Sequence, residues 1–423
     1  MTKEACNALP NKEEKMIKES DVLAYLESKA KPQYSRTQFD AFLNEVNFKF
    51  NRAAIHITGT NGKGSVAYFL NETLINGGYK VGRFVSPSLK TPNEMITINN
   101  SEITNAVFLK YIQRYDELFV KYELTYFEII SFIALTYFKE KRVDIAIIEV
   151  GMGGTIDATN IFTPILSIIT NVTLEHTDFL GKTIEEIATH KAGIIKPKVP
   201  VLLGPMNEAA FTTIANVAIT KQAFLYGVKT PTNIRVSLEG ICFDALHYKN
   251  ICLSMPASYE ATNAALALSA LEIISTKFPV ERDVVFSSFK GVKVPARFSI
   301  IQAKPLVIVD GAHNPAAMSA LINSVKLLSK GAIKVVFAAF KDKDVKQEFD
   351  LLALANASVV VTTFDHHRAR KEEHYPNLTY PFVSDYHQAI KETIGQAKED
   401  EVILITGSLH FALQVYNEFT KEE

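Results

Sequence analysis

Hydrophobic and polar positions alternate along this chain in blocks that predict a mixed α/β protein. Short apolar, β-branched runs are separated by longer stretches with helical periodicity, which is typical of a parallel sheet flanked by helices. Two of the strand runs look buried on both faces, as strands in the middle of such a sheet are. Strands are predicted at 53–58, 80–85, 144–150 and 165–170, and helices at 65–76 and 126–141.

The pattern changes twice in the second half of the chain. Residues 230–256 form short alternating segments, which predict antiparallel hairpins appended to the sheet, and an Ala/Leu-rich helix follows at 260–275. Residues 290–297 carry Gly, Pro and basic residues without periodicity and are predicted to link two domains. The alternation then restarts as a smaller, Rossmann-like unit. Its strands are predicted at 306–309, 334–338, 358–363 and 402–406. We therefore expect two α/β domains, 1–295 and 296–423, with a cleft between them.

Composition and charge narrow the function classes. The 423 residues include 45 Lys+Arg and 46 Asp+Glu, so the net charge of −1 argues against bulk binding to nucleic acid or to an anionic membrane. The longest apolar stretches, such as 129–138, are shorter than the ~20 residues of a membrane helix. The first fifteen residues have no apolar core of a secretion signal. We expect a cytoplasmic protein.

The three cysteines have no metal-ligand spacing. Cys242 and Cys252 are predicted on neighbouring strands as small apolar residues, and a disulfide between them is the less favoured interpretation. The chain is therefore expected to be reduced.

The most informative segment lies between the first strand and the first long helix. Glycines let the backbone turn its N–H groups toward phosphate oxygens, and the helix N-terminus adds a positive dipole. In this segment Lys63 can neutralise phosphate charge and Ser65 can bind Mg²⁺. Its spacing differs from the Walker pattern, because Gly64 separates those two residues. We predict an ATP phosphate loop made of Gly59, Thr60, Asn61, Gly62, Lys63, Gly64 and Ser65.

Three further residues follow predicted strands or helices in ways that indicate metal chemistry. Glu149 ends a buried strand, at the edge where open α/β sheets bind ligands, and a Mg²⁺ role is favoured over a turn carboxylate. His176 follows the next strand, with Asp178 nearby as a partner. Lys191 is either a solvated surface charge or a desolvated amine able to take up CO₂ as a carbamate.

Six motifs appear in one order along the chain: GTNGKGS at 59–65, SPSL at 86–89, TYFE at 125–128, EVGMGGTIDATN at 149–160, HKAGIIK at 190–196 and DGAHNP at 310–315. From 21 to 416 the chain resembles the folylpolyglutamate synthase/dihydrofolate synthase family of the Mur ligase superfamily. The resemblance implies an N-terminal P-loop ATPase domain of the Mur central type, a C-terminal Rossmann-like domain and catalysis between them. ATP would phosphorylate a pteroate or folate carboxylate, and the amine of L-glutamate would attack the acyl phosphate.

The resemblance also implies roles for individual residues. Lys63, His176 and Lys191 are expected to be catalytic, with Lys191 carbamylated. Two Mg²⁺ ions are expected on ligands from Ser65, Ser86, Glu149, His176 and Lys191. Nucleotide contacts beyond the phosphate loop would come from Asn263, Arg297, Asp310 and His313. Substrate contacts would come from Asp40, Thr125, Tyr126, Phe127 and Asp157. A monomer is expected, and a monovalent cation is compatible with the family pattern.

Three positions depart from the family pattern around the expected pterin pocket. Phe42 stands where a glycine is usual, Ser88 replaces a histidine and Thr155 replaces an arginine. The acceptor is therefore left open among dihydropteroate, a reduced folate, both, or a different acid. A Mur-type ligase for a nucleotide-linked sugar is less favoured, because only about fifty residues precede the phosphate loop. A nucleotide-binding switch without a ligase step would not need Glu149, His176 and Lys191 together.

Overall fold

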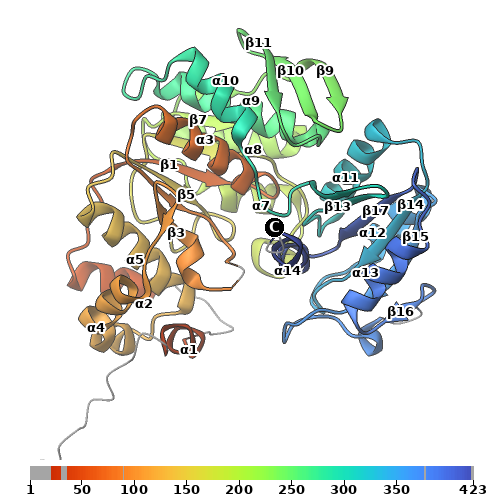
Figure 1. The fold of residues 1–423 in the computed structure, drawn as a ribbon. Coiled ribbons are helices and arrows are strands. Elements are labelled where there is room, and N and C mark those ends of the chain that lie inside the picture. Colours follow the sequence, from red (N-terminus) through yellow and green to blue (C-terminus); the bar gives the residue numbers. More distant parts are fainter. Residues whose placement is uncertain (1–20, 30–35, 89, 376–377, 421–423) are drawn as a thin grey trace, which may run out of the picture.

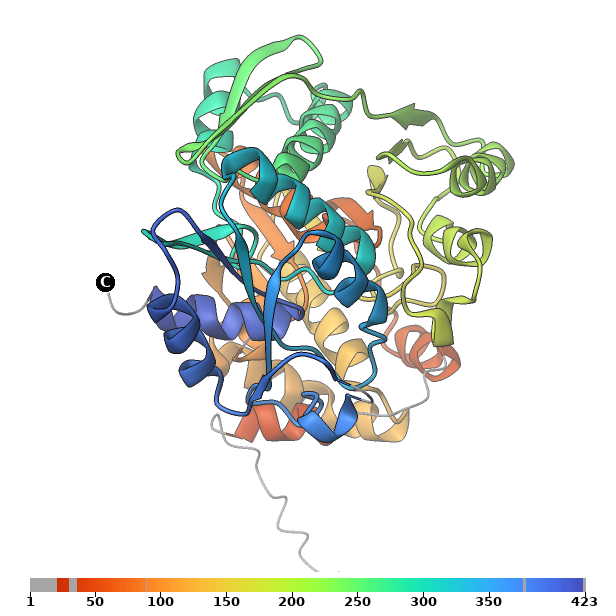
Figure 2. The same cartoon turned by 90° about the vertical axis from the view of Figure 1, so that its right-hand side faces the viewer.

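The computed structural model describes residues 21–29, 36–88, 90–375 and 378–420. The chain forms two α/β units that lie side by side, each around its own sheet (Figure 1). The N-terminal unit holds an eight-stranded and a three-stranded sheet, and the C-terminal unit, which begins at 299, holds a six-stranded sheet. Figure 2, turned by 90°, shows the C-terminal unit in blue in front of the larger one. This is the predicted architecture.

The eight-stranded sheet places the candidate residues at one edge. Six of its strands are parallel, and β3 and β4 add an antiparallel margin. The central strand β1 pairs with β5 and with β6, so the loops after these three strands leave at the same edge. The strand order is β4 (Ser101–Glu102), β3 (Ile96–Ile98), β2 (Val81–Phe84), β5 (Ile145–Glu149), β1 (Ala53–Thr58), β6 (Leu166–Ile169), β7 (Val201–Leu203) and β8 (Leu225–Gly227).

Helices cover both faces of this sheet, which explains why its middle strands are apolar throughout. On β1, Ile55 and Ile57 pack against α3, α9 and α10, and Ala54 faces the core shared with α4 and α5. The helices of the unit are α1 (Val22–Glu27), α2 (Arg36–Glu45), α3 (Lys63–Asn76), α4 (Asn105–Lys121), α5 (Tyr126–Glu140), α6 (Thr177–Leu180), α7 (Ile184–Ala192), α8 (Glu208–Thr220), α9 (Ser258–Ile274) and α10 (Arg282–Gly291), with a 3₁₀ turn η2 (Pro92–Met95). Within the described residues, no helix combines the length and the apolar character required to cross a membrane.

The predicted hairpins form a sheet of their own instead of extending the large one. Strands β9 (Thr232–Ser237), β10 (Gly240–Ala245) and β11 (Tyr248–Leu253) are antiparallel in the order β11-β10-β9. Their apolar side chains pack on α9 and α10 and share the core of the N-terminal unit.

A disulfide joins Cys242 and Cys252, so the expectation of unpaired cysteines is wrong. The two residues do lie on neighbouring strands, as predicted, directly opposite each other on β10 and β11. Their Cα atoms are 4.1 Å apart, which brings the two sulfur atoms into bonding range. The register of the hairpin, which the alternation pattern leaves undetermined, therefore decides the pairing.

The C-terminal sheet has five parallel strands and one antiparallel edge strand. The four predicted strands are present, with ends that agree to within one residue, and the antiparallel β12 was not predicted. The order is β12 (Ser299–Ala303), β13 (Leu306–Val309), β17 (Val402–Thr406), β14 (Ile333–Phe337), β15 (Ser358–Thr362) and β16 (Phe382–Val383). Its helices are α11 (Pro315–Leu328), α12 (Lys346–Leu354), α13 (Tyr386–Gly395) and α14 (Leu409–Phe419), with a 3₁₀ turn η3 (Glu372–His374).

The chain crosses between the units just after α10. The predicted linker begins two residues too early, because α10 continues to Gly291. Ala296 and Phe298 are both buried and have positive φ angles of 52° and 47°. This conformation is costly for residues with a Cβ, and it is held here because Asp310 accepts the N–H of Phe298 at 2.8 Å.

Candidate active site

A cavity of about 960 Å³ lies between the two units. Its walls come from the loops after β1, β2, β5 and β6 and from the first turns of α5, α9 and α11. The loop after β13, Arg297 of the linker, and Arg368 and His410 of the C-terminal unit also line it. The cavity therefore occupies the edge where the sheet topology gathers the ends of the parallel strands.

The predicted phosphate loop runs along one wall of this cavity and is anchored to the end of β6. The backbone N–H of Asn61 donates to Asn171 Oδ1 at 2.9 Å, and Asn171 Nδ2 donates back to the Asn61 carbonyl at 3.0 Å. The hydroxyl of Thr170 donates to the same carbonyl at 2.6 Å. The loop is consequently preformed, with residues 60–65 lining the cavity.

Lys63 and Glu149 meet at the mouth of the loop. Lys63 Nζ donates to the carbonyls of Gly59 and Thr60, each at 3.1 Å, and lies 4.0 Å from Glu149 Oε1. Glu149 is only 4% exposed, and burial raises its pKa to about 7 against the opposing charge of Lys63. The backbone N–H of Ser86 donates to Glu149 Oε2 at 3.4 Å. A bound divalent cation would stabilise the charged form of this buried carboxylate. Carboxylate and hydroxyl oxygens are the ligands that Mg²⁺ prefers.

The start of α9 packs directly onto the phosphate loop. The Ser65 hydroxyl donates to Glu260 Oε1 at 2.7 Å, and Asn263 Nδ2 donates to Glu260 Oε2 at 3.1 Å. Because its proton points to Glu260, the Ser65 oxygen keeps its lone pairs for a cation in the cavity. Gly62 has a φ of 82°, and a Cβ there would lie 2.3 Å from Asn263 Oδ1.

Gly62→Ala should therefore weaken nucleotide binding. The left-handed backbone penalises a side chain by about 1–2 kcal/mol, and the Asn263 collision distorts the loop as well. We expect the KM for ATP to rise by about tenfold, which corresponds to about 1.4 kcal/mol. Gly78→Ala is the matched control, because Gly78 has a φ of 89° and its added Cβ would meet nothing within 4 Å. Equal KM values in the two variants would show that the Asn263 contact does not shape the loop.

The same first turn of α9 also contacts the C-terminal unit. The Tyr259 hydroxyl donates to Asp310 Oδ2 at 2.5 Å, and the hydroxyls of Ser258 and Ser324 are 2.8 Å apart. The other oxygen of Asp310 accepts the N–H of Ala312 at 2.8 Å. Asp310 lines the cavity as predicted, but its carboxylate is already bonded to the linker, to α9 and to its own loop.

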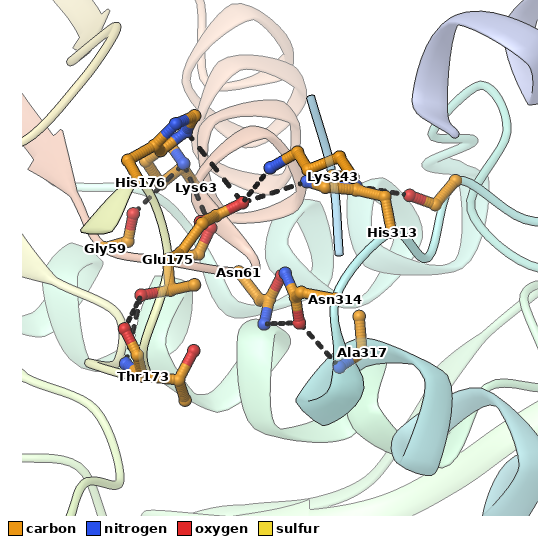
Figure 3. Close-up of polar contacts among 12 residues, drawn as sticks. Gly59, Asn61, Lys63, Thr173, Glu175, His176, His313, Asn314, Ala317 and Lys343 are labelled. Carbon is orange, nitrogen blue, oxygen red and sulfur yellow. Dashed lines mark hydrogen bonds and ion pairs between the residues drawn. The ribbon is translucent and has the colours of Figure 1, made fainter. Parts of the chain in front are cut away.

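A cluster of charges around Glu175 joins the two units inside the cavity (Figure 3). His313 Nε2 donates to Glu175 Oε1 at 3.1 Å, and Lys343 Nζ is 3.6 Å from the same oxygen. His313 Nδ1 faces the Gly311 carbonyl at 2.7 Å, so both ring nitrogens lie against oxygen atoms. Burial alone would raise the pKa of Glu175, but the His313 hydrogen bond and the nearby positive charges hold it well below its usual value.

Glu175 and Lys343 were not among the predicted site residues. The position of Glu175 in the sequence did indicate a functional role, since it lies between the end of a predicted strand and His176. Lys343 lies in the loop after β14 and resembles any surface lysine until the units are brought together.

His176 and Lys191 both follow Glu175 along the chain and precede His313. His176 Nε2 is 3.9 Å from Glu175 Oε1, and partial burial lowers the pKa of His176 to about 4. Lys191, in the last turn of α7, is 3% exposed, and burial together with the charge of Lys63 lowers its pKa to about 7. Within the described part of the chain its amine makes no hydrogen bond or ion pair, although the charge of Glu175 acts on it. The surface-charge interpretation of Lys191 is therefore wrong.

The five predicted metal ligands come from five different segments of the N-terminal unit. The described ranges contain no cluster of three or more His, Cys, Asp or Glu side chains that could hold a metal by themselves. Ser65, Ser86, Glu149 and His176 line the same cavity, and Lys191 lies beneath its surface. Their donor chemistry fits a cation that shares its coordination with phosphate oxygens.

Four of the five predicted substrate residues line the cavity, and Asp40 does not. Asp40 is an exposed residue on α2 that pairs with Arg36 at 2.9 Å, as helical neighbours four residues apart do. Thr125 begins α5 in a capping box with Glu128, which turns Tyr126 and Phe127 toward the cavity. Asp157 also shapes its own loop by accepting the N–H groups of Met152 and Thr159, each at 2.9 Å.

Only one of the three departures from the family pattern reaches the cavity wall. Ser88 lines it, whereas Phe42 is fully buried in an aromatic cluster, 4.8 Å from the Phe132 ring. Thr155 is exposed, and its hydroxyl donates to the His190 carbonyl at 3.1 Å. Arg36 of α2 donates to the Thr155 carbonyl at 3.3 Å, so a guanidinium group from another segment contacts this loop.

Comparison with known proteins agrees with this geometry. The Mur ligase middle domain matches residues 57–271, and the Mur ligase glutamate ligase domain matches residues 296–409. The folylpolyglutamate synthase of Lacticaseibacillus casei is 33% identical, over 85% of this chain and 88% of that protein. The dihydrofolate synthase/folylpolyglutamate synthase of Bacillus subtilis is 31% identical over the same shares. The chain belongs to the folylpolyglutamate synthase/dihydrofolate synthase family of Mur ligases.

Solved structures of this synthase family show the same fold. Mycobacterium tuberculosis folylpolyglutamate synthase, complexed with ADP and AMPPCP, has a TM-score of 0.84 and 26% identity over 95% of this chain and 99% of that one. A bifunctional folylpolyglutamate synthase/dihydrofolate synthase with Mn, AMPPNP and L-glutamate bound has a TM-score of 0.82 and 27% identity, over 95% and 98%. The predicted fold class and the predicted enzyme class, an ATP-dependent acid–amino-acid ligase, are confirmed.

Proposed function

We propose that this synthase activates the carboxylate of a pteroate or folate as an acyl phosphate and joins it to the amine of L-glutamate, releasing ADP and phosphate. One observation carries the proposal: a single cavity is lined by a phosphate loop with Lys63, by Glu175 of the same unit and by His313 of the C-terminal unit, which bonds to Glu175. Relatives with a bound nucleotide, Mn and L-glutamate support the same set of ligands for this chain.

The phosphate loop and its neighbours would hold Mg·ATP. Lys63 would leave the carbonyls of Gly59 and Thr60 and pair with the terminal phosphates, which offer a stronger acceptor. Ser65, Ser86 and Glu149 would bind the first cation, and His176 with a carbamylated Lys191 the second. When bound, these cations supply charge neutralisation for the transferring phosphoryl group.

The chemistry then follows from charge and water exclusion. The acceptor carboxylate attacks the γ-phosphorus, ADP leaves, and the acyl phosphate forms. The neutral amine of glutamate attacks that carbonyl carbon, and phosphate leaves with one proton of the amine as the amide forms. Glutamate brings two carboxylates, and we assign Arg368 and Lys343 of the C-terminal unit to them, because Arg368 lines this cavity and Lys343 Nζ lies 3.6 Å from the cavity-lining Glu175. Closing the cavity protects the acyl phosphate from hydrolysis.

The acceptor would lie along the opposite wall. Tyr126 and Phe127 offer aromatic surface to a pterin or benzoyl ring, and Ser88 and Asp157 offer polar groups. These side chains suit dihydropteroate as well as a reduced folate.

Measuring ADP and amide formation with Mg·ATP and glutamate tests the proposal, with dihydropteroate and tetrahydrofolate compared as acceptors. We expect turnover with both, because the aromatic wall contacts the part that they share. Turnover with one acceptor would assign a single synthase activity. A protein that binds ATP and makes no amide with either would contradict the proposal and direct attention to another acceptor of the Mur type.

A further inference from the structure

The phosphate loop reaches across the cavity and bonds to the C-terminal unit through a reciprocal pair of amides (Figure 3). Asn61 Nδ2 donates to Asn314 Oδ1 at 3.2 Å, and Asn314 Nδ2 donates to Asn61 Oδ1 at 3.0 Å. We call these two side chains the amide pair. Carboxamides are the side chains that can donate and accept in this reciprocal way.

Each member of the amide pair is held firmly by its own unit. The main chain of Asn61 is bonded to Thr170 and Asn171 at the end of β6. Asn314 is the N-cap of α11, where its Oδ1 also accepts the N–H of Ala317 at 2.9 Å. It is also buried. A hydrogen bond between two rigid attachments restrains the relative position of the two units. This one joins the loop that would hold phosphate to α11, the first helix of the C-terminal unit.

The amide pair is also adjacent in sequence to the charged cluster. His313 precedes Asn314 and bonds to Glu175 from the same short loop. The position of α11 relative to the phosphate loop therefore determines where His313 and Lys343 lie. It also determines how far the bound L-glutamate is from the acyl phosphate. A small displacement of an attacking group costs much of the rate of a positioned reaction.

We propose that Asn314 is a positioning residue for the ligation step. Through the amide pair it holds the C-terminal unit over the phosphate loop, so that the amine of glutamate reaches the acyl phosphate before water does. The inference rests on the proposed ligase function and adds to it a residue whose loss uncouples ATP use from amide formation.

Asn314→Ser is the decisive variant. Serine is as good an N-cap as asparagine, so α11 keeps its start, but the shorter side chain does not reach Asn61. Asn207→Ser is the matched control, because Asn207 caps α8 in the same way, accepting the Ala210 N–H at 2.9 Å, and lies outside the cavity lining.

We measure ADP and amide formed by the wild type and both variants under the same conditions. In Asn314→Ser, amide formation should fall by about 5- to 30-fold, the value of one or two lost hydrogen bonds, while ADP release falls much less. ADP formed per amide should therefore rise well above one. The control should keep the wild-type ratio, since a change of cap alone does not move the units.

Two results would overturn the proposal. One is equal loss of ADP and amide in Asn314→Ser, which would mean a purely structural role, and the other is no loss of either, which would mean that the amide pair does not position the units. If the wild type makes no amide with any pterin acceptor, the proposed function fails first. The positioning role is then judged by X-ray scattering with Mg·AMPPNP, in which Asn314→Ser must enlarge the radius of gyration relative to Asn207→Ser, and an unchanged radius rejects it.

Discussion

Lys63→Met should abolish ADP formation, lowering its rate by about 10²- to 10³-fold, the usual cost of losing one group that stabilises developing charge. Methionine keeps the length and apolar stem of the side chain and removes the ammonium, which now bonds to the carbonyls of Gly59 and Thr60. The substitution also affects Glu149, because the charge of Lys63 lowers the pKa of Glu149 against the effect of burial. With that charge gone, Glu149 is more often protonated at neutral pH and binds a divalent cation less well.

The measurement is the rate of ADP release at saturating acceptor, with Mg²⁺ varied. Lys110→Met, an exposed lysine on α4 outside the cavity lining, should behave as the wild type. A Lys63→Met enzyme that keeps more than about a tenth of the wild-type rate would remove this lysine from phosphate neutralisation.

Lys191→Ala should lower ligation by about 100-fold or more, the upper range for a group that supports a metal. The amine is buried and makes no hydrogen bond or ion pair with the residues that the structure describes, and its pKa of about 7 lies below the usual lysine value of 10.5. Above pH 7 the amine is mostly neutral and can add CO₂, forming R–NH–COO⁻ and releasing a proton. Below pH 7 it is an ammonium, which does not react, so activity that depends on the carbamate should fall as the pH drops from 8 to 6.

Removing CO₂ should inactivate the wild type, and bicarbonate should restore it, whereas Lys191→Ala should respond to neither. ¹³C-bicarbonate should give a carbamate signal in NMR spectra that is absent from the variant. Lys196→Ala is the control, because Lys196 lies in the same segment and is also partly buried. Full turnover by Lys191→Ala would exclude this lysine from the mechanism.

Local patterns predicted much of the fold and one wall of the site. The strands at 306–309 and 402–406 match β13 and β17 residue for residue, since buried strands between helices have an unambiguous pattern. The phosphate loop is equally local: its strand, glycines, lysine and helix are contiguous, so Lys63 and Ser65 were found without knowledge of the tertiary structure.

What could not be predicted depends on contacts between distant segments. Lys343 and Glu175 are brought together by the packing of two units, and the disulfide depends on hairpin register. Asp40 is the converse case, because a family motif on α2 implied a substrate contact, whereas Asp40 is exposed, pairs with Arg36 and lies outside the cavity lining. Sequence spacing constrains neighbours along the chain, and it leaves the relative placement of domains undetermined.

The first turn of α9 has a consequence for how such enzymes can diverge in length. Its side chains alternate between partners: Tyr259 bonds to Asp310 of the C-terminal unit, and Glu260 bonds to Ser65 of the phosphate loop. Inserting or deleting one residue there would rotate every later side chain by about 100° and break both connections together. Insertions are therefore excluded from this turn and are better accommodated where a connection serves one partner, as in the exposed turn between β9 and β10.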